Sequence, residues 1–231
     1  MDDIKNNSLS NNPRFSARQR VVIIAPVILI IFMWTVFVNF TQYFGFQGGY
    51  LFAFIIYWVL WCILLPAYAL KGFKNIFSLF KKTVPRFGDK PDITLFLISW
   101  PVVVSLIFAF LPRINNVTIP VVLFSVLLGT VNGFCEEILW RGVYASLFPG
   151  KTWLGYIYPA VLFTLWHICP ISVTVTRFAG GIYSFLAISL LFGLSWGFYT
   201  RKTGSILWSS VMHAACDSLG LGAMLYIGWF L

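Results

Sequence analysis

The stretch GFCEEILWRG, residues 133–142, lies inside a long apolar run that starts near Ile119. It contains Glu136 and Glu137, which are the only two glutamates of the chain. Charged side chains at bilayer depth face the protein interior, have a partner and mark a functional site. The pair therefore predicts a functional site that is buried among membrane-spanning helices.

The composition of the chain supports a membrane protein. The 231 residues are 59% hydrophobic and only 10% charged, and the mean hydropathy is +0.86. Several apolar runs have the roughly 20 residues that one helix needs to cross a bilayer. These runs are continuous, whereas a membrane β-barrel would show short segments of alternating polarity. The fold class is therefore expected to be all-α, a polytopic transmembrane helical bundle.

The apolar runs predict about seven spans and three parts of the chain. The spans are expected over residues 21–40, 50–70, 93–111, 119–148, 154–169, 181–200 and 204–229, and a break of the last one near Gly220 and Gly222 stays open. Residues 1–20 are expected to be a disordered cytoplasmic N-terminus. Residues 21–118 form an N-terminal part of three spans with a basic loop at 71–92, and residues 119–231 form a core of about four spans. The basic loop fits either a helix on the membrane surface or an ordinary positively charged loop.

The net charge of +9 indicates how the chain is oriented in the membrane and does not indicate that it binds nucleic acid. Positive side chains gather in the N-terminal tail, in loop 71–92 and in the connections 149–153 and 201–203. Such a bias marks the cytoplasmic side. We expect a multi-pass protein of the plasma membrane with a cytoplasmic N-terminus and an external C-terminus. Its surroundings are the lipid bilayer, no nucleic acid is expected to bind, and the oligomeric state stays open.

Both histidines of the chain, His167 and His213, also lie inside predicted spans. The helix rise of about 1.5 Å per residue puts Glu136 about 16–18 Å, His167 about 20 Å and His213 about 13 Å from the cytoplasmic ends of their spans. Three helices could therefore present one glutamate and two histidines at one level of the bundle.

Helical spacing separates the two glutamates. Glu137 and Arg141 are four residues apart and share a helix face, so they can form an ion pair. Glu136 points about 100° away from Glu137. The simplest interpretation is that Arg141 neutralises Glu137 structurally and leaves Glu136 free for chemistry.

One glutamate and two histidines support two kinds of hydrolysis. A buried glutamate can act as general base on a water that it shares with His167, while His213 donates to the oxyanion. Alternatively, the same three side chains are a sufficient zinc ligand set with an open position for water. The chain has no HExxH motif, and a role for Cys135, Cys169 or Cys216 as nucleophile or metal ligand is a less favoured reading.

Three short motifs resemble those of a known family. EEILWR, from Glu136 to Arg141, matches EExxxR; FTLWH, from Phe163 to His167, matches FxxxH; HAACD, from His213 to Asp217, matches HxxxN/D. In this order they resemble the CPBP family of intramembrane proteases, which includes type II CAAX prenyl endopeptidases and bacteriocin-processing or self-immunity proteins. The resemblance covers about residues 129–217.

The resemblance implies an intramembrane endopeptidase that needs no cofactor and acts on a membrane-associated peptide or protein. It implies the following roles: Glu136 as general base, His167 as holder of the water, His213 and Asp217 as oxyanion stabilisers, and Glu137, Arg141 and Phe163 as support. The CAAX-processing branch typically has Asn where this chain has Asp217. An ionised Asp cannot donate to an oxyanion, so Asp217 is either protonated or orients His213. A zinc protease and a non-catalytic immunity or peptide-binding protein stay open as alternatives.

Overall fold

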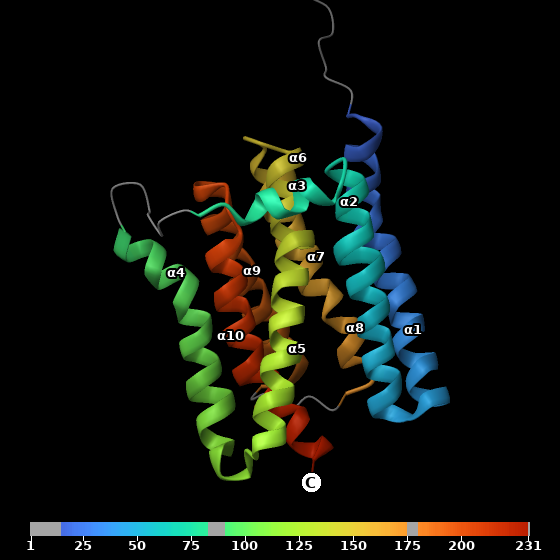
Figure 1. Ribbon diagram of the computed structural model, residues 1–231, viewed down its shortest axis with the longest axis vertical. Helices are drawn as coiled ribbons and strands as arrows, with labels where there is room; N and C mark the ends of the chain where they lie inside the picture. The colour runs from blue at the N-terminus through green and yellow to red at the C-terminus, as the bar shows by residue number, and fades with distance from the viewer. Residues whose placement is uncertain (1–14, 83–90, 175–179, 231) are drawn as a thin grey trace, which may run out of the picture.

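The computed structural model describes residues 15–82, 91–174 and 180–230, which are helical with no strand among them (Figure 1). The N-terminal half contains α1 (Ala17–Ile56), the π-helical η1 (Tyr57–Leu64), α2 (Leu65–Ala69), α3 (Phe73–Phe77), the 3-10 turn η2 (Ser78–Phe80), α4 (Pro91–Val104), the π-helical η3 (Ser105–Phe110) and the 3-10 helix η4 (Leu111–Asn116). The C-terminal half contains α5 (Ile119–Glu137), the π-helical η5 (Ile138–Val143), α6 (Tyr144–Leu147), the π-helical η6 (Trp153–Ile157), α7 (Tyr158–Trp166), α8 (Ile168–Ile171), α9 (Gly181–Thr203), α10 (Leu207–Met224) and the 3-10 turn η7 (Tyr226–Trp229).

Five helical stretches of the described residues are long and apolar enough to cross a membrane. They are Ala17–Ala69, Ile93–Asn116, Ile119–Leu147, Trp153–Ile171 and Gly181–Thr203. Many large apolar side chains on their outer faces are exposed, among them Ile31, Phe96 and Leu123. Long helices that expose apolar side chains outward are typical of a protein surrounded by lipid. The chain is thus an all-helical protein built as an integral multi-pass membrane protein.

The first of these stretches consists of two antiparallel legs. Gly45 interrupts α1 with a φ of 73° and a ψ of 164°, a backbone conformation outside the helical region that a residue without Cβ adopts readily. Figure 1 shows the leg before Gly45 and the leg formed by the end of α1, η1 and α2 side by side. The predicted spans 21–40 and 50–70 both lie in this stretch.

One sequence-based prediction about an element end differs from the structure, and the structure answers one question that the sequence leaves open. Residues 17–20 were expected in the disordered tail, but they form the first turn of α1. Ser16 and Gln19 form a capping box in which each side chain bonds the backbone N–H of the other, and this arrangement begins a helix firmly. The rest of that tail, up to residue 14, lies outside the described residues.

The open question concerns the last helix. The sequence leaves open a break near Gly220 and Gly222, and α10 runs through both glycines to Met224. Gly222 lies so close to Ser125 of α5 that a side chain there would collide with it. The glycine thus provides room for a neighbouring helix and does not interrupt its own.

The basic loop is described only in part. The five-residue helix α3 crosses the upper end of the bundle, transverse to the long helices (Figure 1). Ile76 and Leu79 are buried, whereas Phe73 and Phe77 are exposed. A transverse segment that buries some apolar side chains against the bundle and exposes others agrees with a position at a membrane surface. Residues 83–90 of this loop lie outside the described residues.

Among the described elements, α5 and α10 pack against each other most extensively. Small residues recur every four positions along both helices, which lets the two backbones approach. The facing pairs are Gly133 with Ala214, Gly129 with Ser218, and Ser125 with Gly222. An added Cβ on Gly133 would lie 2.5 Å from the backbone nitrogen of Ala214. This close seam holds Glu136 and Glu137 beside His213.

Candidate functional site

The site begins where α5 ends. Glu136 and Glu137 are the last two residues of α5, and the chain continues without a break as the wider π-helical stretch η5, which contains Arg141. Short π-helical stretches are frequent at functional sites because they re-aim side chains within a continuous helix. Both glutamates are almost completely buried, with exposures of 2% and 0%, so their charges must be balanced inside the protein.

Glu136 has two distinct carboxylate oxygens. Oε1 accepts hydrogen bonds from Trp166 Nε1 at 2.8 Å and from the Tyr57 hydroxyl at 3.2 Å. Oε2 lies 3.4 Å from His213 Nε2 and has no hydrogen-bond donor of good geometry among the described residues. The two oxygens are therefore unequal: Oε1 is held by two donors, whereas Oε2 is held by none among the described residues.

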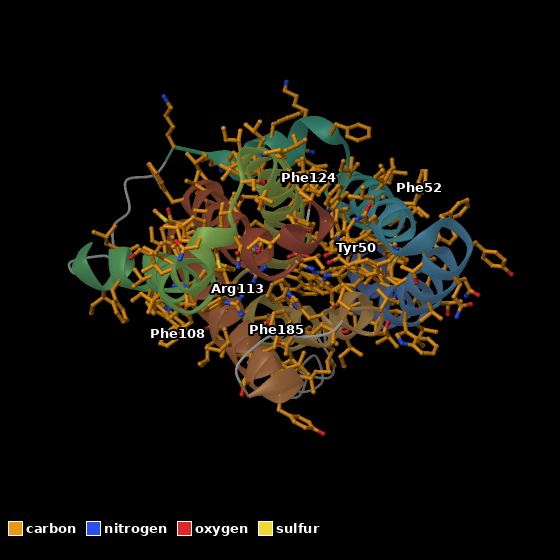
Figure 2. The ribbon with its side chains drawn as sticks, turned by 90° about the horizontal axis from the view of Figure 1, so that it is seen from below. Tyr50, Phe52, Phe108, Arg113, Phe124 and Phe185 are labelled. Atoms are coloured by element: carbon orange, nitrogen blue, oxygen red, sulfur yellow. The ribbon has the colours of Figure 1, made fainter. Side chains whose placement is uncertain are left out.

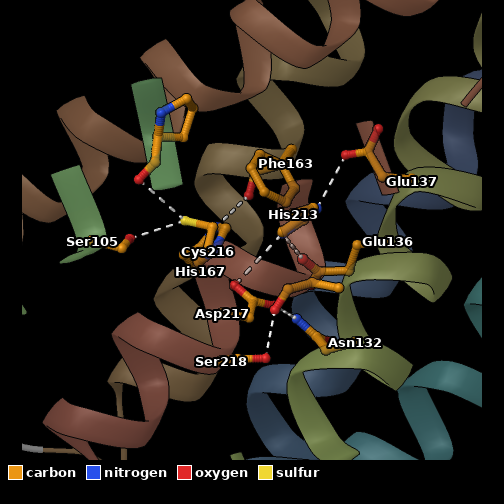
Figure 3. A network of polar contacts seen from close by, with 12 residues as sticks. Ser105, Asn132, Glu136, Glu137, Phe163, His167, His213, Cys216, Asp217 and Ser218 are labelled. Atoms are coloured by element: carbon orange, nitrogen blue, oxygen red, sulfur yellow. Dashed lines mark hydrogen bonds and ion pairs between the residues drawn. The ribbon is translucent and has the colours of Figure 1, made fainter. Parts of the chain in front are cut away.

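Glu137 contacts two basic side chains, whereas the helical spacing predicts only one. Its Oε1 lies 3.0 Å from Arg141 Nη1, as helical spacing predicts, and also 3.1 Å from His213 Nδ1 (Figure 3). The Arg141 guanidinium lies over the Phe163 ring at 4.1 Å, and Gly193 of α9 leaves space for it. Glu137 thus connects the buried arginine to the histidine of α10.

His213 lies among three carboxylates. Nδ1 faces Glu137, while Nε2 faces Glu136 and also Asp217, whose Oδ1 is 3.7 Å away. The imidazole is stacked on Trp196, with ring centroids 4.2 Å apart and an interplanar angle of 25°. Contacts on both nitrogens and on one ring face hold His213 in a single orientation.

Asp217 is bound to an amide that the sequence did not single out. Asn132 lies one turn before Glu136 on α5, and its Nδ2 donates to Asp217 Oδ2 at 2.8 Å. Trp58 Nε1 donates to Asn132 Oδ1 at 2.9 Å. An indole N–H can only donate, so this contact assigns the oxygen of the Asn132 amide to the Trp58 side and the nitrogen to the Asp217 side.

His167 comes from the end of α7, whereas the glutamates come from α5 and His213 comes from α10. It follows directly after the last residue of α7, and its Nδ1 lies 2.8 Å from the Phe163 carbonyl. A carbonyl oxygen can only accept, so Nδ1 carries the proton in this contact and Nε2 is left as an acceptor. The Phe163 and His167 rings meet edge to face at 4.6 Å. The FxxxH spacing therefore fixes both the orientation and the tautomer of this histidine.

A cavity of about 150 Å³ brings these side chains together. Glu136, His167, His213 and Asp217 all line it, together with Asn132. The remaining wall is largely apolar and comes from α1, α4, η3, α7, α8, α9 and α10, including Tyr50, Phe108 and Phe185, which Figure 2 shows from below. A mostly apolar cavity with a few convergent polar groups is the usual form of a binding or active site.

The cavity also contains a group that could hold a metal ion. Three ligand atoms lie within 4.8 Å of one another, one each from Glu136, His213 and Asp217. One imidazole and two carboxylates suit zinc or another divalent metal in composition. The zinc set considered from the sequence had His167 in place of Asp217, and His167 is not a member of the group that the described residues form.

The four cysteines are buried and free. Cys216 lines the cavity, where its sulfur lies 3.0 Å from Ser105 Oγ. No cysteine belongs to the metal-binding group found among the described residues. Burial among apolar side chains is typical of structural cysteines.

Three contributors to the site were missed by sequence reasoning. They are Tyr57, Asn132 and Trp166, each of which bonds one of the acidic side chains. Asn132 could have been found, because it lies four residues before Glu136 and thus on the same helix face. Trp166 directly precedes His167, but nothing in its spacing indicates that its indole points to Glu136.

Comparison with known proteins identifies the segment that carries these motifs. Residues 116–219 match the family model described as type II CAAX prenyl endopeptidase Rce1-like. The matched segment includes Glu136, His167, His213 and Asp217, so the resemblance in the three motifs is confirmed at the level of the family. No curated protein and no solved structure matches the chain.

Proposed function

The chain contains an Rce1-like domain of the type II CAAX prenyl endopeptidase family at residues 116–219, and from this premise we propose that it is an intramembrane endopeptidase. Its substrate is a membrane-associated peptide or protein, whose peptide bond is hydrolysed by a water that Glu136 activates. The observation that carries the proposal is the inequality of the Glu136 oxygens. Oε1 is fixed by two donors, while Oε2 accepts no hydrogen bond from the described residues and lies 3.4 Å from His213 Nε2, on a side chain that lines the cavity.

In this mechanism Glu136 and His167 share the attacking water. Glu136 Oε2 accepts one proton of the water, and His167 Nε2, free of the Phe163 carbonyl, accepts a hydrogen bond from the other. The water is thereby oriented toward a peptide carbonyl in the cavity. The proton that Glu136 takes is later delivered to the leaving amine, so that the carboxylate is restored.

His213 and its partners supply the electrostatic side of the reaction. The oxyanion that forms on the attacked carbonyl needs a donor, and His213 lines the cavity with its Nε2 beside the carboxylates of Glu136 and Asp217. Glu137 holds the opposite nitrogen of His213 and Arg141 holds Glu137. We propose that Asp217 orients His213 and does not itself donate to the oxyanion, since it already accepts from Asn132.

The topology that we propose has seven crossings. The stretch Ala17–Ala69 counts as two because it turns at Gly45, and α10 adds one to the remaining four stretches. The N-terminal part up to residue 118 then forms three crossings and the core from residue 119 forms four. The positive charges of loop 71–92 and of the connections near Lys151 and Arg201 put the N-terminus in the cytoplasm of a plasma-membrane protein and the C-terminus outside.

The experiment that tests this function uses the full chain reconstituted in lipid nanodiscs. The probe is an internally quenched peptide with a farnesylated cysteine near its C-terminus, offered beside the same peptide without the farnesyl group. We expect cleavage by the wild-type protein and a loss of about 10²–10⁴-fold in the Glu136→Gln variant. Cleavage of both peptides would indicate that the prenyl group is not required, and unchanged cleavage by a folded Glu136→Gln variant would contradict the proposal.

A zinc-dependent protease is a second candidate that one observation favours. Glu136, His213 and Asp217 already lie close enough together to hold an ion, which would polarise a water or a carbonyl when bound. Metal analysis of the purified protein and dialysis against a strong chelator separate the two. The glutamate mechanism predicts full cleavage after the metal has been removed, whereas a zinc enzyme would lose activity and regain it with added zinc.

A non-catalytic immunity or peptide-binding protein differs from both enzymes in one measurement. It would bind a peptide in the same cavity without producing fragments, and Glu136→Gln would preserve its phenotype. Mass spectrometry of the probe peptides after incubation with wild-type protein distinguishes these cases. We expect two fragments that sum to the substrate plus one water, and an intact peptide would favour binding alone.

The contact between Asn132 and Asp217 gives a prediction about charge. Asn132→Asp replaces the amide with a carboxylate that lies 2.8 Å from Asp217 Oδ2. A charge-assisted hydrogen bond is lost and like charges meet, so the cleavage rate should fall by about 10–100-fold. The reciprocal variant Asn132→Asp/Asp217→Asn again pairs an amide with a carboxylate, and we expect it to recover much of the rate. Wild-type cleavage by the single variant Asn132→Asp would contradict the importance of this contact.

A further inference from the structure

Two consecutive residues outside the matched domain contact the proposed active site. Tyr57 and Trp58 open the π-helical stretch η1, in the second leg of the first membrane stretch. Tyr57 is completely buried and Trp58 is half-buried. Their targets, Glu136 and Asn132, lie one turn apart on the same face of α5. A single turn of the N-terminal part therefore reaches two polar side chains of the domain at residues 116–219.

The contact of Tyr57 has a fixed direction. Trp140 Nε1 donates to the Tyr57 hydroxyl at 2.8 Å, and an indole N–H can only donate. The hydroxyl proton of Tyr57 is thereby left for the second contact, and the hydroxyl donates to Glu136 Oε1 at 3.2 Å. The Tyr57 ring is stacked on Trp166, the other donor to Oε1, with centroids 3.8 Å apart and an interplanar angle of 19°. Tyr57 thus both donates to Oε1 and supports the second donor.

The contact of Trp58 also has a fixed direction. Trp58 Nε1 donates to Asn132 Oδ1, which turns the amide nitrogen of Asn132 toward Asp217. Without this donor, the Asn132 amide could rotate and present its oxygen to the Asp217 carboxylate. Trp58 therefore acts on Asp217 through Asn132, in parallel with the action of Tyr57 on Glu136.

Neither Tyr57 nor Trp58 is among the residues that line the cavity. A substrate in the cavity would meet Glu136, Asn132 and Asp217 but not the two aromatic side chains behind them. We expect them to act by holding reactive side chains in place. Such an effect changes the rate of the chemical step more than it changes the affinity for substrate.

We propose that Tyr57 and Trp58 are positioning residues of the active site, supplied by the N-terminal part of the chain: Tyr57 holds Glu136 Oε1 so that Oε2 faces the cavity, and Trp58 holds the Asn132–Asp217 pair. The inference rests on the proposed function, since it assigns these residues to the glutamate that activates water. It makes the first membrane stretch a part of the catalytic apparatus and gives it a role beyond packing.

The test compares two tyrosine-to-phenylalanine variants of the full chain in nanodiscs with the quenched peptide that the wild type cleaves. Tyr57→Phe removes one oxygen atom and keeps the ring that stacks on Trp166. We expect kcat to fall by roughly tenfold with KM unchanged, as for the loss of one hydrogen bond to a charged group. The matched control is Tyr144→Phe, because Tyr144 is equally buried and its hydroxyl donates to the Val22 carbonyl at 2.9 Å, away from Glu136. We expect this control to keep the wild-type kcat.

Two further variants test the direction of the contacts. Trp58→Phe removes the donor to Asn132 and should lower kcat severalfold with KM unchanged. Trp140→Phe should lower kcat more in the wild type than in Tyr57→Phe, because the Trp140 N–H donates to the Tyr57 hydroxyl and the substituted ring can still pack beside Phe163. Equal effects of Trp140→Phe in the wild type and in Tyr57→Phe would overturn this chain of contacts.

The outcomes separate this inference from the proposed function. If Glu136→Gln abolishes cleavage while Tyr57→Phe and Trp58→Phe match Tyr144→Phe in kcat, the positioning role is wrong and the function stands. If Glu136→Gln cleaves at the wild-type rate, the proposed function itself fails. Thermal unfolding in detergent accompanies each variant, and if Tyr57→Phe does not fold, Trp58→Phe decides the inference alone.

Discussion

Replacing Arg141 by methionine is expected to destabilise the protein by about 3–5 kcal/mol, the cost of leaving a buried carboxylate without its partner. Arg141 is 3% exposed and Glu137 is fully buried, so solvent cannot replace the lost cation. The guanidinium also packs against Phe163 and Trp196, with its carbon 4.1 and 5.6 Å from the two ring centroids. Arg141→Lys should be intermediate, because it keeps the charge but loses the planar group. Unfolding of the purified variants in detergent, followed by heat or denaturant, measures these differences.

A double variant shows whether the effect comes from the ion pair. Glu137→Gln in the Arg141→Met background removes the carboxylate that has lost its arginine partner, and we expect it to restore most of the lost stability. Arg201→Met serves as control, because Arg201 is exposed at the end of α9 and should change stability by less than about 0.5 kcal/mol. An Arg141→Met variant as stable as the Arg201→Met variant would contradict the structural role of the pair.

Replacing Gly133 by alanine is expected to lower the stability of the protein and its cleavage activity together. The added Cβ would lie 2.5 Å from the backbone nitrogen of Ala214 and 2.8 Å from its Cα. Backbone atoms cannot rotate away, so α5 and α10 must separate, at a cost of about 1–3 kcal/mol. His213 precedes Ala214 on α10 and would move away from Glu136 and Glu137. We therefore expect a lower unfolding temperature together with a loss of peptide cleavage.

Gly48→Ala is the matched control for Gly133→Ala. Gly48 also lies in a helix, but its added Cβ would meet only Phe44 Cβ at 3.7 Å, which is an ordinary van der Waals distance. We expect unchanged or slightly higher stability, since alanine favours a helix more than glycine does. Equal behaviour of the two alanine variants would show that the seam tolerates separation and does not hold the site.

The sequence predicted the fold class because the physics of a bilayer leaves few solutions. Apolar runs such as 119–148 must be helical where lipid cannot satisfy backbone groups, and the helix that contains Glu136 was therefore foreseeable. The seam between α5 and α10 was overlooked, although Gly129 and Gly133 have the small-xxx-small spacing that brings membrane helices close. For the same reason the sequence leaves open whether the last span breaks near Gly222, because the contact of this glycine with Ser125 depends on helix packing.

The candidate site was predictable in its members but not in their connections. Spacing along a helix indicates that Glu137 and Arg141 meet, because both lie on one element. It cannot indicate that Glu137 also contacts His213, since that contact depends on how two helices pack. For the same reason no pattern pointed to Tyr57 or Trp58, whose partners lie 79 and 74 residues away in the chain. A glutamate that seemed to be structural support thus lies at the centre of the polar network.

The central claim is that Glu136 activates the water that hydrolyses a peptide bond. Its most direct measurement is the cleavage rate of one defined peptide by Glu136→Gln, with Glu137→Gln and wild type in parallel and with folding of each protein confirmed by thermal unfolding. If Glu136 is the general base, Glu136→Gln loses about 10²–10⁴-fold in kcat while it unfolds near the wild-type temperature. A folded Glu136→Gln protein that produces fragments at the wild-type rate would contradict the account.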